Sequence, residues 1–184
     1  AEARRARKAV AVVTDVPTGD QVLYHPGEWG DDDLGREIAS RMKSGKSGLL
    51  GDTGSESFIQ VHVPSARLVI IGAVHISQAL VPMAQACGLD VTVIDPRTAF
   101  ASAERFTQVE LHADWPQDVL QTRPLDAYTA LVAVTHDPKI DDLPLQSALK
   151  EGCFYIGALG SRKTHGKRVA RFEEAGIDAA QLDG

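Results

Sequence analysis

The chain has 184 residues, of which 43% are hydrophobic and 24% are charged, values typical of a globular protein that can bury a core. The formal net charge of −6 argues against a general nucleic-acid or anionic-membrane surface. No stretch approaches the roughly 18 apolar residues of a membrane span. The basic N-terminus also lacks the apolar core of a secretory signal. We therefore expect a cytoplasmic protein that binds neither nucleic acid nor membranes.

The two cysteines are not arranged as a metal or redox motif. Cys87 and Cys153 lie far apart in apolar-looking segments, so we expect both to be buried, reduced thiols. No H-E-x-x-H motif and no second histidine at metal-ligand spacing occurs, so we predict no metal site. The sequence begins without Met and stops at QLDG, and we expect it to be part of a longer protein, truncated at its end.

Residues 1–64 predict a small α+β extension. Alternating apolar residues predict strands over 9–16 and 21–25, separated by the turn at Pro17–Gly19. The stretch 31–45 predicts a helix, with acidic residues at its start and a glycine at its end. Short strands are expected over 47–51 and 57–63. About 60 residues make a small core, so we interpret this part as the end of a preceding domain.

Residues 65–184 alternate strands with helices. Strands are predicted over 67–72, 90–95, 128–135 and 153–160, with a weaker one over 107–111. Helices are predicted over 76–88, around 115–121, over 140–152 and over 161–176. Continuous apolar strands between helices indicate a parallel sheet covered on both faces. The expected fold is therefore α/β, a Rossmann-like, doubly wound and mainly parallel sheet with strand order 3-2-1-4-5.

Polar residues and glycines follow the predicted strands at one edge of the sheet. In open parallel sheets, ligands bind outside the carboxyl ends of the strands, so these residues are expected to line one cleft. The candidates are Gly72 and His75 after the first strand, Asp95 and Arg97 after the second, His136 and Asp137 after the strand over 128–135, and Gly160, Ser161, Arg162 and Lys163 after the last.

The turn at Gly72 resembles a damaged dinucleotide-binding fingerprint. A G-x-G-x-x-G turn would place glycines where Val74 and Ser77 stand, and the second glycine normally allows close approach to a pyrophosphate. Asp95 follows Gly72 by 23 positions, as suits a carboxylate that binds a ribose hydroxyl. The alternative is that Asp95 forms a turn before Pro96, and His75 either caps its helix or contacts a ligand.

The start of the last helix is the strongest anion-binding candidate. Ser161 is the expected N-cap, and Arg162 and Lys163 place two cations beside free N–H groups. The alternative is a solvated basic helix face that continues through Lys167, Arg168 and Arg171.

His136 and Asp137 are the candidates for direct chemistry. This pair follows a buried strand and could serve acid–base catalysis. Metal binding is the other direct role considered for the pair, and the alternative to both is that it forms a turn or contacts a ligand without reacting.

Four motifs in chain order carry a family resemblance. LVIIGAVHISQAL, VTVIDPR followed by AFASAERF, VTHDPK and IGALGSRKTH together resemble the C-terminal Rossmann-like domain of the xanthine dehydrogenase accessory factor family, the XdhC and CoxI type. The resemblance covers about residues 64–183. Two features depart from the family pattern. Val74 replaces the second glycine of the usual GAGH motif, and residues 1–60 contain no cysteine, although the family's N-terminal domain usually carries one.

The resemblance implies a maturation factor for a molybdenum hydroxylase. Such proteins bind molybdenum cofactor (molybdopterin) and hand it to the apo-enzyme, so the expected partners are that apo-enzyme, a cofactor sulfurase and a second copy of the chain. One alternative is an NAD(P)-dependent oxidoreductase that uses Gly72, Asp95 and His136. Another is an interaction domain without a ligand, which Val74 favours.

Overall fold

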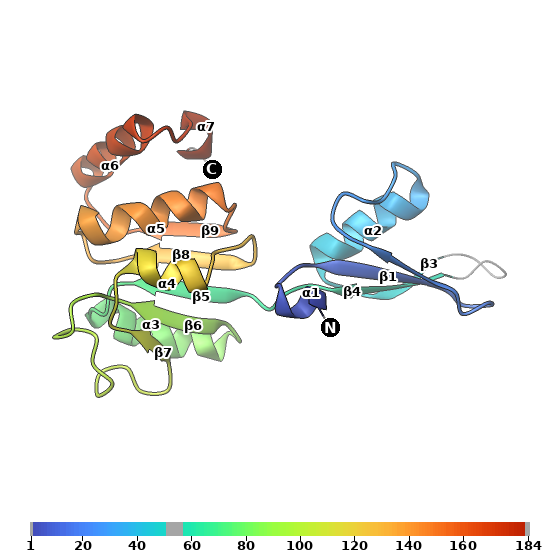
Figure 1. Cartoon of the computed structure of the whole chain (residues 1–184), viewed down its shortest axis with the longest axis horizontal. Coiled ribbons are helices and arrows are strands. Elements are labelled where there is room, and N and C mark those ends of the chain that lie inside the picture. Colours follow the sequence, from blue (N-terminus) through green and yellow to red (C-terminus); the bar gives the residue numbers. More distant parts are fainter. Residues whose placement is uncertain (1, 51–56, 183–184) are drawn as a thin grey trace. The chain divides into compact units, whose positions relative to one another are not determined.

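The structure is a computed structural model that describes residues 2–50 and 57–182. The chain divides into two compact units, Ala1–Pro64 and Ser65–Gly184. The assignment of residues 1–64 to the end of an accessory-factor domain stays a prediction. Elements are labelled in Figure 1.

The first unit contains an antiparallel sheet of order β2-β1-β4-β3. Its strands are β1 (Val10–Asp15), β2 (Gln21–Tyr24), β3 (Gly48–Leu50) and β4 (Ser57–His62). The helices are α1 (Glu2–Arg5) and α2 (Asp33–Ser44). The strands and α2 agree with the expectation, except that α1 was not predicted and Gly51, the predicted end of a strand, lies outside the described residues.

Helix α2 covers one face of this sheet. Asp32 caps its start by accepting a hydrogen bond from the Gly35 N–H at 2.8 Å. Ile38 is 1% exposed and packs in one cluster with Ala11 and Ile59 of the sheet. The small core of this unit therefore forms between α2 and the central strands.

The second unit is a five-stranded parallel sheet of order β7-β6-β5-β8-β9. Its strands are β5 (Arg67–Ile71), β6 (Asp90–Ile94), β7 (Glu110–His112), β8 (Thr129–Ala133) and β9 (Tyr155–Ala158). This is the predicted order 3-2-1-4-5, so the Rossmann-type α/β fold is confirmed. The last strand is shorter than predicted, because its pairing with β8 runs only from Tyr155 to Ala158.

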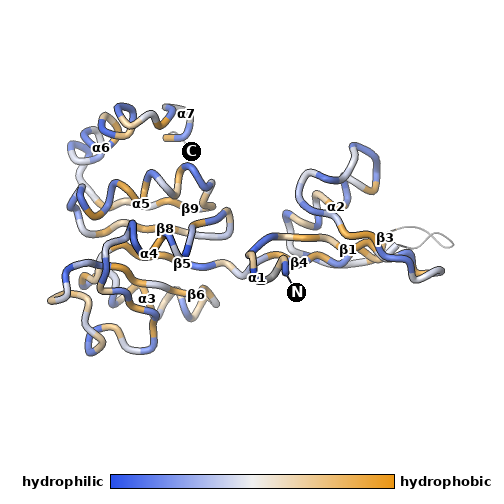
Figure 2. The backbone as a smooth tube through the Cα atoms, viewed as in Figure 1, coloured by the Kyte–Doolittle hydropathy of each residue, from blue (hydrophilic) through white to orange (hydrophobic). Residues whose placement is uncertain are grey.

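Helices cover both faces of the parallel sheet. They are α3 (His75–Ala86), α4 (Pro116–Thr122), α5 (Pro138–Lys150), α6 (Arg162–Glu174) and α7 (Ala179–Leu182), of which α7 was not predicted. Side chains alternate along β5: Ile70 packs in the cluster that contains residues of α3, whereas Ile71 packs in the cluster of α4, α5 and α6. Figure 2 shows hydrophobic colouring along the central strands and mostly hydrophilic colouring along α6.

The two thiols differ in their exposure. Cys87 is exposed at the end of α3, and Cys153 is partly buried, so the expectation of two buried thiols is wrong for Cys87. It follows Ala86, the last residue of α3, which is also exposed. Within residues 2–50 and 57–182, every helix is too short or too polar to cross a bilayer.

Candidate functional site

The candidate site lies where the loops leave the carboxyl ends of the parallel strands. Strands β5 and β8 are neighbours at the centre of the sheet. The chain leaves β5 toward β6 and leaves β8 toward β9, which lie on opposite sides. The loops after β5 and β8 therefore flank a topological switch point, where open α/β sheets bind their ligands.

The turn after β5 is shaped by its protein neighbours. Gly72 has a φ of 118°, and a Cβ there would lie 2.8 Å from Cγ2 of Thr135 in the loop after β8. The glycine is thus required by close approach of that loop. Val74 precedes α3 and packs partly against the hydrophobic cluster that contains Ala73 and Phe106. His75 begins α3 and is exposed.

The Asp95 carboxylate joins the ends of β5 and β6. It is fully buried and accepts hydrogen bonds from the Ala73 N–H at 2.8 Å and the Arg97 N–H at 3.0 Å. The Arg97 guanidinium adds two more, at 2.9 Å and 2.7 Å. Burial acts to raise the pKa of Asp95, but hydrogen bonds from Arg97 and Ala73 outweigh it, so the pKa lies below its usual value. Asp95 therefore holds two turns together.

Arg97 is held from two sides. Besides its pair with Asp95, its guanidinium lies 4.5 Å from the centre of the Phe100 ring. Both contacts restrain the side chain beside the turn after β5. Ribose binding by Asp95 stays a prediction, and it would require these hydrogen bonds to be exchanged.

The loop after β8 is organised by a second buried carboxylate, Asp141 of α5. Asp141 is 1% exposed and accepts hydrogen bonds from the Thr135 hydroxyl at 2.6 Å and the His136 N–H at 2.9 Å. His136 has a φ of 66°, a conformation that costs energy in most residues but is less rare in histidine. Burial raises the pKa of Asp141 above its usual value, although its hydrogen bonds act to lower it. Asp137 caps α5 by accepting from the Lys139 N–H.

The start of α6 is capped as the sequence predicts. The Ser161 hydroxyl accepts a hydrogen bond from the Thr164 N–H at 3.2 Å. Gly160 precedes it, and a Cβ there would lie 3.2 Å from the Thr164 side chain. Arg162 and Lys163 are both exposed in the first turn.

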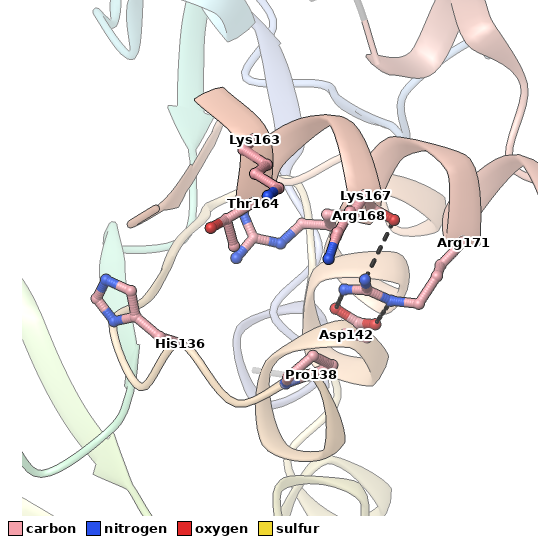
Figure 3. A pocket seen from close by; sticks show the side chains of 8 residues that line it. All are labelled: His136, Pro138, Asp142, Lys163, Thr164, Lys167, Arg168 and Arg171. Carbon is pink, nitrogen blue, oxygen red and sulfur yellow. Dashed lines mark hydrogen bonds and ion pairs between the residues drawn. The ribbon is translucent and has the colours of Figure 1, made fainter. Parts of the chain in front are cut away.

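A cationic pocket of about 250 Å³ lies between α6 and the start of α5. Figure 3 shows the side chains that line it, which are His136, Pro138, Asp142, Lys163, Thr164, Lys167, Arg168 and Arg171. The lining thus contains four cationic side chains and one carboxylate. That carboxylate, Asp142, is already paired with Arg171 at 2.6 Å and 2.9 Å, so the remaining cations give the pocket a positive character.

Arg168 is the unusual side chain of this pocket. Its residue is 5% exposed, and its Nη2 donates to the Leu159 carbonyl at 3.2 Å. Its Nε and Nη1 are buried and have no hydrogen-bond partner in residues 2–50 and 57–182. A buried cation whose donors are unsatisfied costs free energy, so Arg168 is suited to a negatively charged ligand.

The predicted site residues fall into three groups. His136 and Lys163 line the cationic pocket. Gly160, Ser161 and Asp137 shape the turns at the starts of α6 and α5, and Gly72 shapes the turn after β5. Arg162 is exposed at the start of α6, and His75, Asp95 and Arg97 lie at the turns after β5 and β6. Ligand binding by all of these residues, and chemistry by His136 and Asp137, stay predictions. No group of three or more metal-ligating side chains gathers in the described parts of the chain.

The sequence did not lead us to predict that Arg168 is a buried part of the pocket. A solvated basic face would expose Arg168, but this residue points inward on the same stripe of α6 as Phe172, which is 3% exposed. The spacing of four between Thr164, Arg168 and Phe172 was the available signal, since such residues share one helix face. Lys167, Arg171 and Asp142 also line the pocket.

Comparison with known families identifies the second unit. The family model described as the XdhC Rossmann domain matches residues 68–184. The chain belongs to the XdhC Rossmann domain family. The family resemblance expected from the sequence motifs is thus confirmed.

Two curated relatives are similar to part of this chain. The chain is 32% identical over 113 residues to the molybdenum cofactor insertion chaperone PaoD of Escherichia coli K12, covering 61% of this chain and 29% of that protein. It is 29% identical over 111 residues to a probable xanthine dehydrogenase subunit of Bacillus subtilis 168, covering 60% of this chain and 34% of that protein.

The fold is also shared with a xanthine dehydrogenase from Bacillus halodurans. That comparison has a TM-score of 0.61 and 22% identity, and covers 91% of this chain and 52% of the other. The chain therefore spans about a third of the length of the curated relatives and about half of this structure.

Proposed function

We propose that this protein is an accessory factor of a molybdenum hydroxylase such as xanthine dehydrogenase, binding molybdenum cofactor and delivering it to the apo-enzyme. The observation that carries the proposal is the cationic pocket beside α6, in which the buried guanidinium of Arg168 lacks partners for two of its nitrogens among the described residues. Membership of the XdhC Rossmann domain family and the name of the PaoD relative support this class of cargo.

The residues present fit an anionic cofactor. Molybdopterin carries a terminal phosphate and a polar pterin edge. Lys163, Lys167 and Arg168 would hold the negative group, and His136 on the facing loop would contact the part of the cargo that extends toward β8. The bound cofactor would supply redox chemistry only after transfer, so this chain needs groups that hold and release it.

The turns after β5 and β6 have a supporting part in this proposal. Asp95 and Gly72 fix the shape of that wall, while His75 and Arg97 lie where they could contact the rest of the cargo. The proposal includes a cytoplasmic location, the apo-enzyme and a cofactor sulfurase as partners, and assembly as a homodimer.

Titration of the purified chain with molybdopterin, NADH and NADPH tests the proposal. We expect saturable molybdopterin binding that weakens in a Lys163→Gln/Lys167→Gln variant. Lys150→Gln is the control, because Lys150 is an exposed cation in the last turn of α5 that does not line the pocket.

Two outcomes would contradict the proposal. Micromolar NADH or NADPH binding without molybdopterin binding would favour an NAD(P)-dependent oxidoreductase. Absence of binding to all three compounds would favour an interaction domain.

A further inference from the structure

The pocket beside α6 is lined by Arg168, a buried cation that is only partly hydrogen-bonded within residues 2–50 and 57–182. Arg168 is 5% exposed, and its Nη2 donates a hydrogen bond to the Leu159 carbonyl. Arginine is always charged and presents five N–H donors in a planar fork. Two of its nitrogens, Nε and Nη1, are buried without partners in the described parts of the chain.

The carboxylates around Arg168 are committed to other groups. Asp142 lines the same pocket but forms a two-bond pair with Arg171. Asp141 attracts Arg168 electrostatically, yet each of its oxygens accepts a hydrogen bond from the loop after β8, from Thr135 or His136. A ligand in the pocket would therefore bring a countercharge that these two carboxylates do not provide.

The rest of the lining adds positive charge around the same point. Lys163 and Lys167 are exposed and line the pocket one turn apart on α6. The pocket also lies near the N-terminal turn of α6, a helix of 13 residues, where free N–H groups and the helix dipole favour anions. In Figure 3 the side chains of Lys163, Lys167 and Arg168 extend from α6, and the His136 ring lies on the facing loop.

The volume limits what part of a ligand can enter. About 250 Å³ is below the roughly 300–1,000 Å³ of sites that enclose whole drug-sized ligands. The pocket is therefore suited to one compact end group. Arginine favours planar, two-point recognition of carboxylate or phosphate, and a phosphate monoester carries about −1.5 to −2 charges at pH 7, which matches a lining with several cations.

We infer that this pocket binds a terminal phosphate monoester and that Arg168 is the residue that holds it. The inference rests on the proposed function and deepens it, because it names the group of the cargo that is recognised. It puts the phosphate beside α6, away from the turn after β5 where a dinucleotide fold would bind it.

Inorganic phosphate tests this site on the full 184-residue chain. Thermal unfolding is followed as phosphate increases, with ionic strength held constant by chloride, because a ligand that binds only the folded state raises the melting temperature. We expect a saturable rise for the unmodified chain. Arg168→Met should weaken apparent phosphate affinity by about 10- to 100-fold, the effect of losing a charge-assisted hydrogen bond.

Two further variants separate binding from folding. Arg168→Lys keeps the charge but loses the fork, so its affinity should fall between those of the unmodified chain and Arg168→Met. Lys163→Gln/Lys167→Gln alters only exposed side chains, so it should fold normally and bind phosphate several-fold more weakly. Lys150→Gln should match the unmodified chain, because Lys150 is exposed in the last turn of α5 and does not line the pocket.

Each result decides the inference. No phosphate-dependent rise in the unmodified chain would overturn it, as would equal affinities for Arg168→Met and Lys150→Gln. If Arg168→Met does not fold, an unchanged affinity in the double lysine variant would overturn it. Phosphate binding without molybdopterin binding would uphold the site and refute the proposed cargo, so the two failures are distinguishable.

Discussion

Replacing Gly72 with alanine tests why this glycine follows β5. The added Cβ would lie 2.8 Å from Cγ2 of Thr135, 3.0 Å from Cγ2 of Val134 and 3.3 Å from the backbone nitrogen of Thr135. The two side-chain contacts come from β-branched residues with little freedom to move. The φ of 118° is a further strain for alanine. A crowded core site costs about 1–3 kcal/mol and an unfavourable backbone about 1–3 kcal/mol, so we expect a loss of roughly 2–6 kcal/mol in unfolding free energy.

Urea unfolding followed by tryptophan fluorescence measures this loss. The chain has two tryptophans, so a Trp29→Phe background leaves Trp115 to report on the second unit. Gly88→Ala is the matched control, because Gly88 has a φ of 80° but no atom within 4 Å of an added Cβ. It should cost only about 1–2 kcal/mol, the backbone part. Equal losses for the two variants would refute the steric explanation, and would leave the glycine available for the ligand role that a dinucleotide fingerprint assigns to it.

Four other substitutions test the turns of the candidate site and the exposure of the two thiols. Val74→Gly should not create micromolar NADH binding, because Asp95 still accepts hydrogen bonds from Ala73 and Arg97. Fluorescence titration with NADH checks this, and tight binding would contradict it. Burial acts to raise the pKa of Asp95, but the hydrogen bonds that the carboxylate accepts hold this pKa low. Asp95 therefore adds to the unfolding free energy above about pH 4, and this contribution is lost as pH falls through the folded-state pKa. Asp95→Asn should flatten this acid-side loss in urea unfolding. Burial raises the pKa of Asp141, so the pH dependence of its contribution to the unfolding free energy is reversed. This contribution is present below about pH 4 and is lost as pH rises through the folded-state pKa. Asp141→Asn should remove that loss in urea unfolding. Finally, burial raises the pKa of Cys153 to about 11, so a thiol reagent at pH 8 should modify exposed Cys87 at least about tenfold faster; Cys87→Ser should leave only the slow reaction.

The topology of the second unit could be predicted because the hydrophobic pattern, the helix ends and the crossover rule all indicate the same strand order. Continuous apolar runs such as RLVIIG and YTALVAVT separate helices with clear ends, and right-handed crossovers leave few orders for such strands. The cap at Ser161 was predictable for the same local reason. The short helices α1 and α7 were not, since each has four residues and therefore carries little periodicity.

The site was harder to predict because a side chain's partners depend on distant elements. Asp95 has the spacing of a ribose-binding carboxylate. A turn between Asp95 and Arg97 was the local alternative, but nothing local shows that the distant Ala73 N–H also uses this carboxylate. In the sequence, Arg168 is one cation among several on α6, because its burial depends on the packing of that helix. The sequence therefore indicated one edge of the sheet as the candidate site, whereas the structure was needed to show which charged groups there are already paired with one another.

That distribution explains why the two sides of the switch point differ. After β5 and β6, the N–H of Ala73 and the charge of Arg97 are both satisfied by Asp95, so a phosphate there would have to replace contacts within the protein. Beside α6, Arg171 is satisfied by Asp142, but the two buried nitrogens of Arg168 are unsatisfied within the described residues. An anion binding beside α6 gains hydrogen bonds without breaking any that the structure shows, whereas one binding at the turn after β5 must first compete with a buried carboxylate. In our proposal the Rossmann fold keeps its usual edge for binding, and the anion lies beside Arg168, whose Nε and Nη1 have no partner among the described residues.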